Sequence, residues 1–192
     1  HQVVIVPIYK GDEQRAAVET AVAPIVEALQ KAAIRVHFDN RDTHKPGYKF
    51  NEYELKGVPL RIGIGPRDVE NGTVELARRD TLSKKNVAQA DLVNEITSTL
   101  EEIQAALFDR AKDFRARHTT EVDTFDAFKE VLETKGGFIS AYWDGTEATE
   151  TAIKEATKAT IRCIPLDGKP ANGTCVYSGK PAKQRVLFAK AY

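Results

Sequence analysis

The chain has 192 residues, of which 42% are hydrophobic and 29% charged, a composition ordinary for a soluble globular protein of one large or two small domains. Its 28 basic and 28 acidic residues balance, which argues against a protein that coats nucleic acid by bulk attraction. The balance does not argue against a protein that reads a few exposed bases. No apolar run approaches the roughly 20 residues that span a bilayer, and no secretory signal is apparent.

The two cysteines are too few for a disulfide framework, so we expect a reducing, cytoplasmic location and no contact with a membrane. The sequence contains no Met and enters a strand pattern almost at residue 1. We therefore expect a fragment cut at a domain boundary.

The first 38 residues carry a β-α-β pattern. Residues 3–8 are nearly continuous and β-branched, which is typical of a strand buried on both faces. A helical pattern follows over residues 13–33, with Asp12 as a candidate N-cap and Pro24 as a candidate kink. A second strand is predicted at 34–38, and such crossovers are parallel and right-handed.

The next segment predicts a polar loop, a short helix and two more strands. Residues 39–45 form the loop at the carboxyl end of the second strand, where ligands tend to bind in open α/β sheets. Pro46 suits the first position of a helix that runs to about Lys56, and Gly57 suits its C′ position. Residues 58–64 predict a third strand. Asn71-Gly72 predicts a hairpin with a returning strand at 73–79, so the sheet is mixed.

A long amphipathic helix is predicted over residues 88–118, as a bridge to a second unit. Its expected buried stripe consists of Leu92, Ile96, Leu100, Ile103, Leu107, Ala111 and Phe114. In the second unit, helices are expected near 124–132 and 147–157, and strands near 138–143, 160–164 and 185–189. We therefore predict an α/β protein with a mixed-sheet domain at 1–118, including the linking helix, and a small α+β domain at 119–192.

The segment from Asp39 to Asp68 is the candidate functional surface, because it gathers Arg, Lys, Asp, Glu and aromatic residues around loops and strand ends. Carboxylates accept hydrogen bonds from base amino groups, and Arg donates to guanine O6 and N7. Tyr and Phe offer platforms on which unstacked bases stack. Chemistry alone leaves two alternatives open: a base-reading surface, or surface salt bridges around a short helix.

Several segments, in order along nearly the whole chain, resemble prolyl-tRNA synthetases of the archaeal/eukaryote-like type, within the class II aminoacyl-tRNA synthetases. They are residues 3–8, 46–61, 65–68 and 186–192. The resemblance implies a class IIa anticodon-binding domain with five anticodon-contacting residues: Glu54, Arg61, Arg67, Asp68 and a lysine, Lys84 or Lys85. The proline anticodons share two guanines, which suits Arg at O6/N7 and carboxylates at the N1–H and N2 donors.

The second unit resembles the C-terminal domain of the same family, which often holds zinc through four cysteines. The corresponding positions here are Asp144, Ala148, Cys175 and Ser178. A tetrahedral structural site needs four good ligands, so we expect no zinc. Cys163 lies in an apolar strand and is expected to be a buried thiol. The family's chain ends at a Tyr near the synthetase active site, so we expect Tyr192 to dock on a catalytic domain absent from this chain.

The function implied by the resemblance is recognition of the tRNA(Pro) anticodon. The full-length enzyme would ligate proline to tRNA(Pro) with ATP and Mg²⁺, as a homodimer, through an N-terminal class II catalytic domain. No P-loop, nucleophile elbow or paired-His metal motif occurs, so we expect no catalytic residues and no activity in this fragment. The alternative is a free-standing anticodon-binding-domain-like RNA-binding or regulatory module. A small doubly wound enzyme would need a perturbed acid–base pair that the sequence does not supply.

Overall fold

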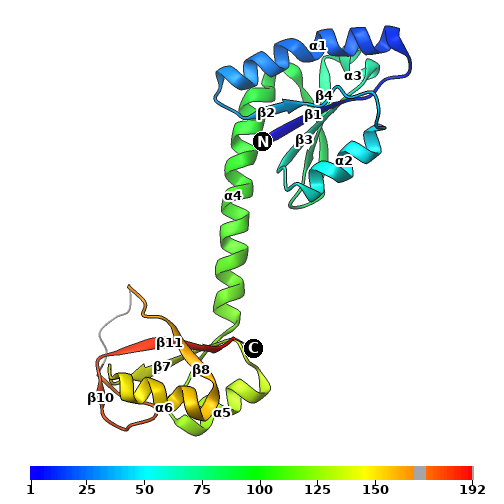
Figure 1. Cartoon of the computed structure of the whole chain (residues 1–192). Coiled ribbons are helices and arrows are strands. Elements are labelled where there is room, and N and C mark those ends of the chain that lie inside the picture. The colour runs from blue at the N-terminus through cyan, green and yellow to red at the C-terminus, as the bar shows by residue number, and fades with distance from the viewer. Residues whose placement is uncertain (167–171, 192) are drawn as a thin grey trace. The chain divides into compact units, whose positions relative to one another are not determined.

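The structure, a computed structural model, describes residues 1–166 and 172–191 and divides into two units, 1–108 and 109–192, each with its own sheet (Figure 1). The prediction for Tyr192 lies outside the described residues. In the part that is described, no helix is both long enough and apolar enough to cross a membrane.

The first unit contains a five-stranded sheet in the order β2-β1-β3-β4-β5. The strands β1 (Val3–Pro7), β2 (Val36–Phe38) and β3 (Leu60–Ile64) are parallel, and β4 (Thr73–Arg78) and β5 (Lys84–Ala88) are antiparallel additions. Every residue of β1 is buried, as its continuous apolar run predicts. The predicted mixed α/β sheet is confirmed.

Helices cover the two faces of this sheet unequally. Helices α1 (Asp12–Lys31) and α3 (Pro66–Asn71) and the first turns of α4 (Leu92–Arg117) pack on one face and complete the larger core. Helix α2 (Pro46–Leu55) packs on the other face, where Tyr53 and Val58 meet Val4 and Val6 of β1 (Figure 1). The residues of β4 and β5 take no part in the core under α2, so this part of the face remains uncovered.

Two local predictions in this unit differ from the structure. Gly11 has φ 80° and precedes α1, so Asp12 is the first helical residue and not a cap, and α1 continues through Pro24. Asn71-Gly72 ends α3, with Gly72 at φ 63° as the left-handed C-cap, and is not a hairpin turn. The second error arises because the residues that favour tight turns also favour helix ends.

Helix α4 follows a short 3₁₀ turn (Gln89–Asp91), and its apolar stripe is buried over only part of its length. Ile96 and Ile103 are buried, but Leu107 is 39% exposed and Phe114 57% exposed. The predicted buried stripe is therefore wrong beyond Ile103, because the core that covers it ends there.

The second unit contains a four-stranded sheet in the order β6-β7-β11-β8. Strands β6 (Thr119–Glu121) and β7 (Phe138–Trp143) are parallel, and β11 (Gln184–Lys190) lies antiparallel to β7 and β8 (Ala159–Cys163). Helices α5 (Phe125–Thr134) and α6 (Glu147–Thr157) complete the core, and β9 (Gly173–Thr174) pairs with β10 (Pro181–Ala182).

The helices and long strands of this unit agree with the predicted positions to within a few residues, whereas the short strands β6, β9 and β10 were not predicted. Cys163 is exposed, so the prediction of a buried thiol is wrong. The reason is its position at the end of β8, an edge strand of the sheet. Cys175 is the buried cysteine.

Candidate nucleic-acid interface

The uncovered part of the α2 face is polar because side chains alternate along β3, β4 and β5. Arg61 lies opposite Ala77 and Gly63 opposite Glu75, and the next strand adds Lys84 opposite Ala77. The intervening residues point to the other face and fill the larger core: Leu60, Ile62, Val74 and Leu76. The strand pattern thus places a row of charged groups beside α2.

Arg61 is the most enclosed of these charged groups. It is 8% exposed, and its guanidinium carbon lies 3.6 Å from the centre of the Phe50 ring on α2. Its Nη1 lies 3.3 Å from Oε1 of Glu75, and Nζ of Lys84 lies 3.5 Å from the same oxygen. A stacked guanidinium is more rigid than a free one, so its donors are presented in a fixed plane.

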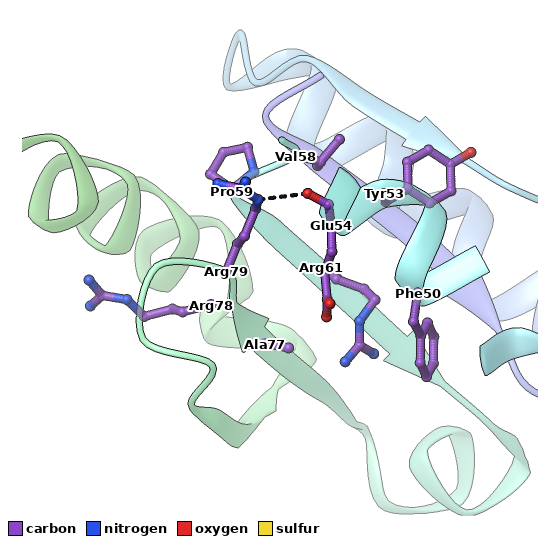
Figure 2. Close-up of a pocket in the computed structure, with 9 residues that line it drawn as sticks. All are labelled: Phe50, Tyr53, Glu54, Val58, Pro59, Arg61, Ala77, Arg78 and Arg79. Atoms are coloured by element: carbon purple, nitrogen blue, oxygen red, sulfur yellow. Dashed lines mark hydrogen bonds between the residues drawn. The ribbon is translucent and has the colours of Figure 1, made fainter. Parts of the chain in front are cut away.

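A shallow hollow beside Arg61 lies between α2, the start of β3 and the end of β4 (Figure 2). Glu54 and Arg79 line it, and Nε of Arg79 donates a hydrogen bond to the backbone carbonyl of Glu54 at 2.8 Å. The Glu54 carboxylate is exposed and has no hydrogen-bond or ion-pair partner among residues 1–166 and 172–191. The Glu54 carboxylate is therefore free to accept hydrogen bonds next to the stacked guanidinium of Arg61.

Arg67 and Asp68 lie apart from this hollow, in the first turn of α3 beyond the carboxyl end of β3. Arg67 is exposed. Asp68 accepts a hydrogen bond from the backbone N–H of Gly65 through Oδ2 at 2.8 Å, so one of its oxygens holds the start of the helix. The structure thus gathers Glu54, Arg61 and Lys84 around one surface and leaves these two residues at its far end.

The two candidate lysines of β5 point to opposite faces of the sheet. Lys84 shares the face of Arg61, whereas Lys85 forms an ion pair with Glu95 of α4 on the other face.

Three contributors to the surface were not singled out from the sequence: Phe50, Glu75 and Arg79. The alternation of β4 is the signal for Glu75, but its meeting with Arg61 depends on the register between strands.

The first residue of the loop after β2 points into the protein, whereas residues 40–43 and 45 are exposed. Asp39 is 1% exposed and accepts from Nε and Nη2 of Arg41 at 2.9 and 2.7 Å and from Tyr53 Oη at 3.2 Å. Burial alone would raise the pKa of Asp39, but the hydrogen bonds from Arg41 and the charge of buried Lys49 hold the pKa of this carboxyl below its usual range. Burial and Asp39 together raise the pKa of Tyr53 to about 12.

The positions at which the resemblance implies zinc ligands form a hydrogen-bonded cluster. Asp144 accepts through Oδ1 from the backbone N–H and hydroxyl of Thr146 at 3.1 and 2.9 Å. It accepts through Oδ2 from the hydroxyls of Thr149 and Ser178 at 2.8 and 2.6 Å. Both carboxylate oxygens are engaged and Ala148 offers no ligand atom, so these residues do not fit a four-ligand zinc site.

In comparisons with known proteins, each unit matches a family model. A family model described as the anticodon binding domain matches residues 2–99, and one described as the C-terminal part of prolyl-tRNA synthetase matches residues 125–192. Proteins named Proline--tRNA ligase from Flavobacterium johnsoniae and Christiangramia forsetii are 60% and 56% identical over 191 residues. One from Porphyromonas gingivalis is 52% identical over 192 residues.

These alignments cover 100% of this chain, and the chain spans 39% of the length of the curated relatives it matches. The matched families follow the two units in order, with the polar surface beside α2 inside the first match. The chain therefore belongs to the anticodon-binding domain family, in the form found in the C-terminal region of prolyl-tRNA synthetases.

Proposed function

We propose that the surface formed by Glu54, Arg61 and Lys84 binds the anticodon of tRNA(Pro). The observation that carries this proposal is the Arg61 guanidinium, stacked on Phe50, beside the open carboxylate of Glu54. A guanine presents acceptors at O6 and N7 and donors at N1 and N2, which complement a guanidinium and a carboxylate respectively.

Arg67 and Asp68 extend the same proposal to the far end of the surface. Asp68 commits Oδ2 to Gly65, which leaves Oδ1 to accept from a base. Arg67 is exposed and can donate to a neighbouring base or phosphate. Glu54 with Arg61 forms one set of donors and acceptors, and Asp68 with Arg67 forms a second. In this proposal each set binds one of the two guanines that proline anticodons share.

We propose the activity of the whole protein from the names of the relatives. A chain of their length would ligate proline to tRNA(Pro), as their name states, in a part beyond these 192 residues. The resemblance to class II synthetases supports a requirement for ATP and Mg²⁺, a cytoplasmic location and a homodimeric assembly. The region described here would contribute selection of the RNA and no catalytic residue.

We also propose that the second unit folds without zinc. The Asp144 cluster links the turn between β7 and α6 to the segment between β9 and β10, as a metal site would, but with hydrogen bonds alone. A stoichiometric zinc ion in protein purified without chelators would contradict this.

Substitution of Arg61 tests the anticodon proposal. Arg61→Lys keeps the positive charge but removes the planar pair of donors, so we expect binding of an RNA hairpin with a UGG anticodon loop to weaken by about 1–3 kcal/mol. The measurement is the Kd for this hairpin and for one in which adenines replace both guanines.

The wild-type chain is expected to prefer the guanine hairpin, and Arg61→Lys to lose most of that preference. Arg35→Lys is the matched control, because Arg35 is an exposed arginine outside the surface. Equal guanine preference in wild type and Arg61→Lys would remove Arg61 from the site. The absence of any preference in wild type would overturn the anticodon proposal.

A further inference from the structure

Arg79 lies where β4 ends, and two contacts fix its position beside the hollow. Its backbone N–H donates to the carbonyl of Pro59 at 3.0 Å, and its Nε donates to the carbonyl of Glu54 at 2.8 Å. The Glu54 carbonyl belongs to the last turn of α2, where it also accepts from the backbone N–H of Gly57 at 3.1 Å. Figure 2 shows the resulting bridge from the β4 end to the end of α2.

This anchoring uses one of the five N–H donors of the guanidinium. The neighbouring arginines are neutralised: Arg78 pairs with Asp80 and Glu102, and Arg61 pairs with Glu75. No carboxylate of the described ranges, 1–166 and 172–191, lies within 4 Å of a nitrogen of Arg79, and the side chain is exposed. Arg79 thus presents positively charged donors at the rim of the hollow that Glu54 lines.

We propose that Arg79 binds a phosphate of the RNA backbone next to the base that Glu54 reads; this inference rests on the proposed anticodon function. A nucleotide carries donors on its base and an anion on its phosphate, so the Glu54 carboxylate and the Arg79 guanidinium complement its two ends. The fork of free donors suits two phosphate oxygens. Phosphate contacts position an RNA and carry no sequence information, so Arg79 acts on affinity and register.

The test separates charge from the contact to α2. Arg79→Gln removes the charge but keeps an amide that can donate to the Glu54 carbonyl, whereas Arg79→Lys keeps the charge. The Kd of the 192-residue chain is measured for the guanine and adenine hairpins over a range of salt concentrations. Arg35→Gln is the matched control, since it removes the same charge from an exposed position outside the surface.

We expect Arg79→Gln to bind both hairpins about tenfold more weakly, the loss of one charge-assisted contact. The slope of log K against log salt becomes shallower by about 0.7, the value for one phosphate on a single strand. Arg79→Lys and Arg35→Gln retain the wild-type slope, and the guanine-to-adenine ratio is unchanged in all variants.

A wild-type slope in Arg79→Gln overturns the proposal, because Arg79 then acts only on the end of α2. Loss of guanine preference in Arg79→Gln also overturns it, since Arg79 would then read a base. If wild type binds both hairpins equally, the anticodon proposal fails, but the salt slope still decides the role of Arg79. If wild type binds neither hairpin, both proposals fail.

Discussion

The buried carboxylate of Asp39 joins several polar groups under α2. It accepts from Arg41 and Tyr53 and faces the nearly inaccessible Nζ of Lys49, which is 3.5 Å from Oδ1. Removal of one partner from a buried ion pair leaves the other charge uncompensated. We therefore expect Asp39→Asn to lower the free energy of unfolding by about 3 kcal/mol at pH 7, measured by urea denaturation.

The pH dependence of this effect follows from the direction of the pKa shift. The pKa of Asp39 is lower in the folded chain than in the unfolded chain, so its ionised carboxylate stabilises the fold above the unfolded pKa of about 3.9. That stabilisation is lost as the pH falls below about 4. Asp42→Asn is the control, because Asp42 is exposed in the same loop and 3.5 Å from Arg15. A difference between Asp39→Asn and wild type that stayed constant down to pH 3 would contradict the assignment.

The residues of the candidate site divide into those that sequence patterns single out and those that only the register between strands reveals. Glu54 and Arg61 stand in a segment with an excess of base-reading side chains, so they could be nominated directly. Glu75 and Arg79 could not, because their roles depend on which residue of β3 or α2 lies opposite. Asp39 shows the reverse case, since a charged loop residue that suggested RNA contact is buried within the protein.

At the scale of elements, the turn between β7 and α6 is held by the Asp144 cluster. Burial would raise the pKa of Asp144, but hydrogen bonds from Ser178, Thr149 and Thr146 lower it to about 2. We expect Asp144→Ala to destabilise the second unit by about 1–2 kcal/mol at pH 7, because three hydroxyl groups lose their acceptor. Thermal unfolding is the measurement.

The contribution of Asp144 is fully present above the unfolded pKa of about 3.9 and is lost as the pH falls towards 2, since the folded pKa is the lower one. Asp126→Ala is the matched control, because Asp126 lies in the first turn of α5 with its side chain almost fully exposed. The assignment fails if both variants unfold at the same temperature. It also fails if a chelator lowers the unfolding temperature of wild type, because a metal would then hold the turn.

The elements that could be predicted are those with long periodic patterns, such as α1 and α6, or with apolar runs, such as β1 and β11. The three short strands of the second unit have two or three residues each, too few for a period to be recognised. The end of the buried stripe on α4 could not be predicted either. The helical period continues to Phe114, but burial depends on the extent of the core and not on the helix itself.

At the scale of the whole molecule, all proposed RNA contacts belong to one unit. Glu54, Arg61, Arg79 and Lys84 lie within residues 1–108, whose core includes both sheet faces and the buried part of α4 up to Ile103. The chain as a whole carries no net charge, so the location of RNA binding is argued from these local contacts and not from bulk attraction. Affinity should therefore reside in the first unit alone.

A chain of residues 1–108 tests this directly. We expect it to fold cooperatively and to bind the guanine hairpin within about threefold of the 192-residue chain, a difference below about 0.7 kcal/mol. A chain of residues 109–192 is the control and should show no preference between the guanine and adenine hairpins. Circular dichroism establishes folding, and hairpin titration gives the Kd. If residues 1–108 fold but bind more than tenfold more weakly, the second unit contributes contacts to the RNA, and an anticodon site confined to the first unit is wrong.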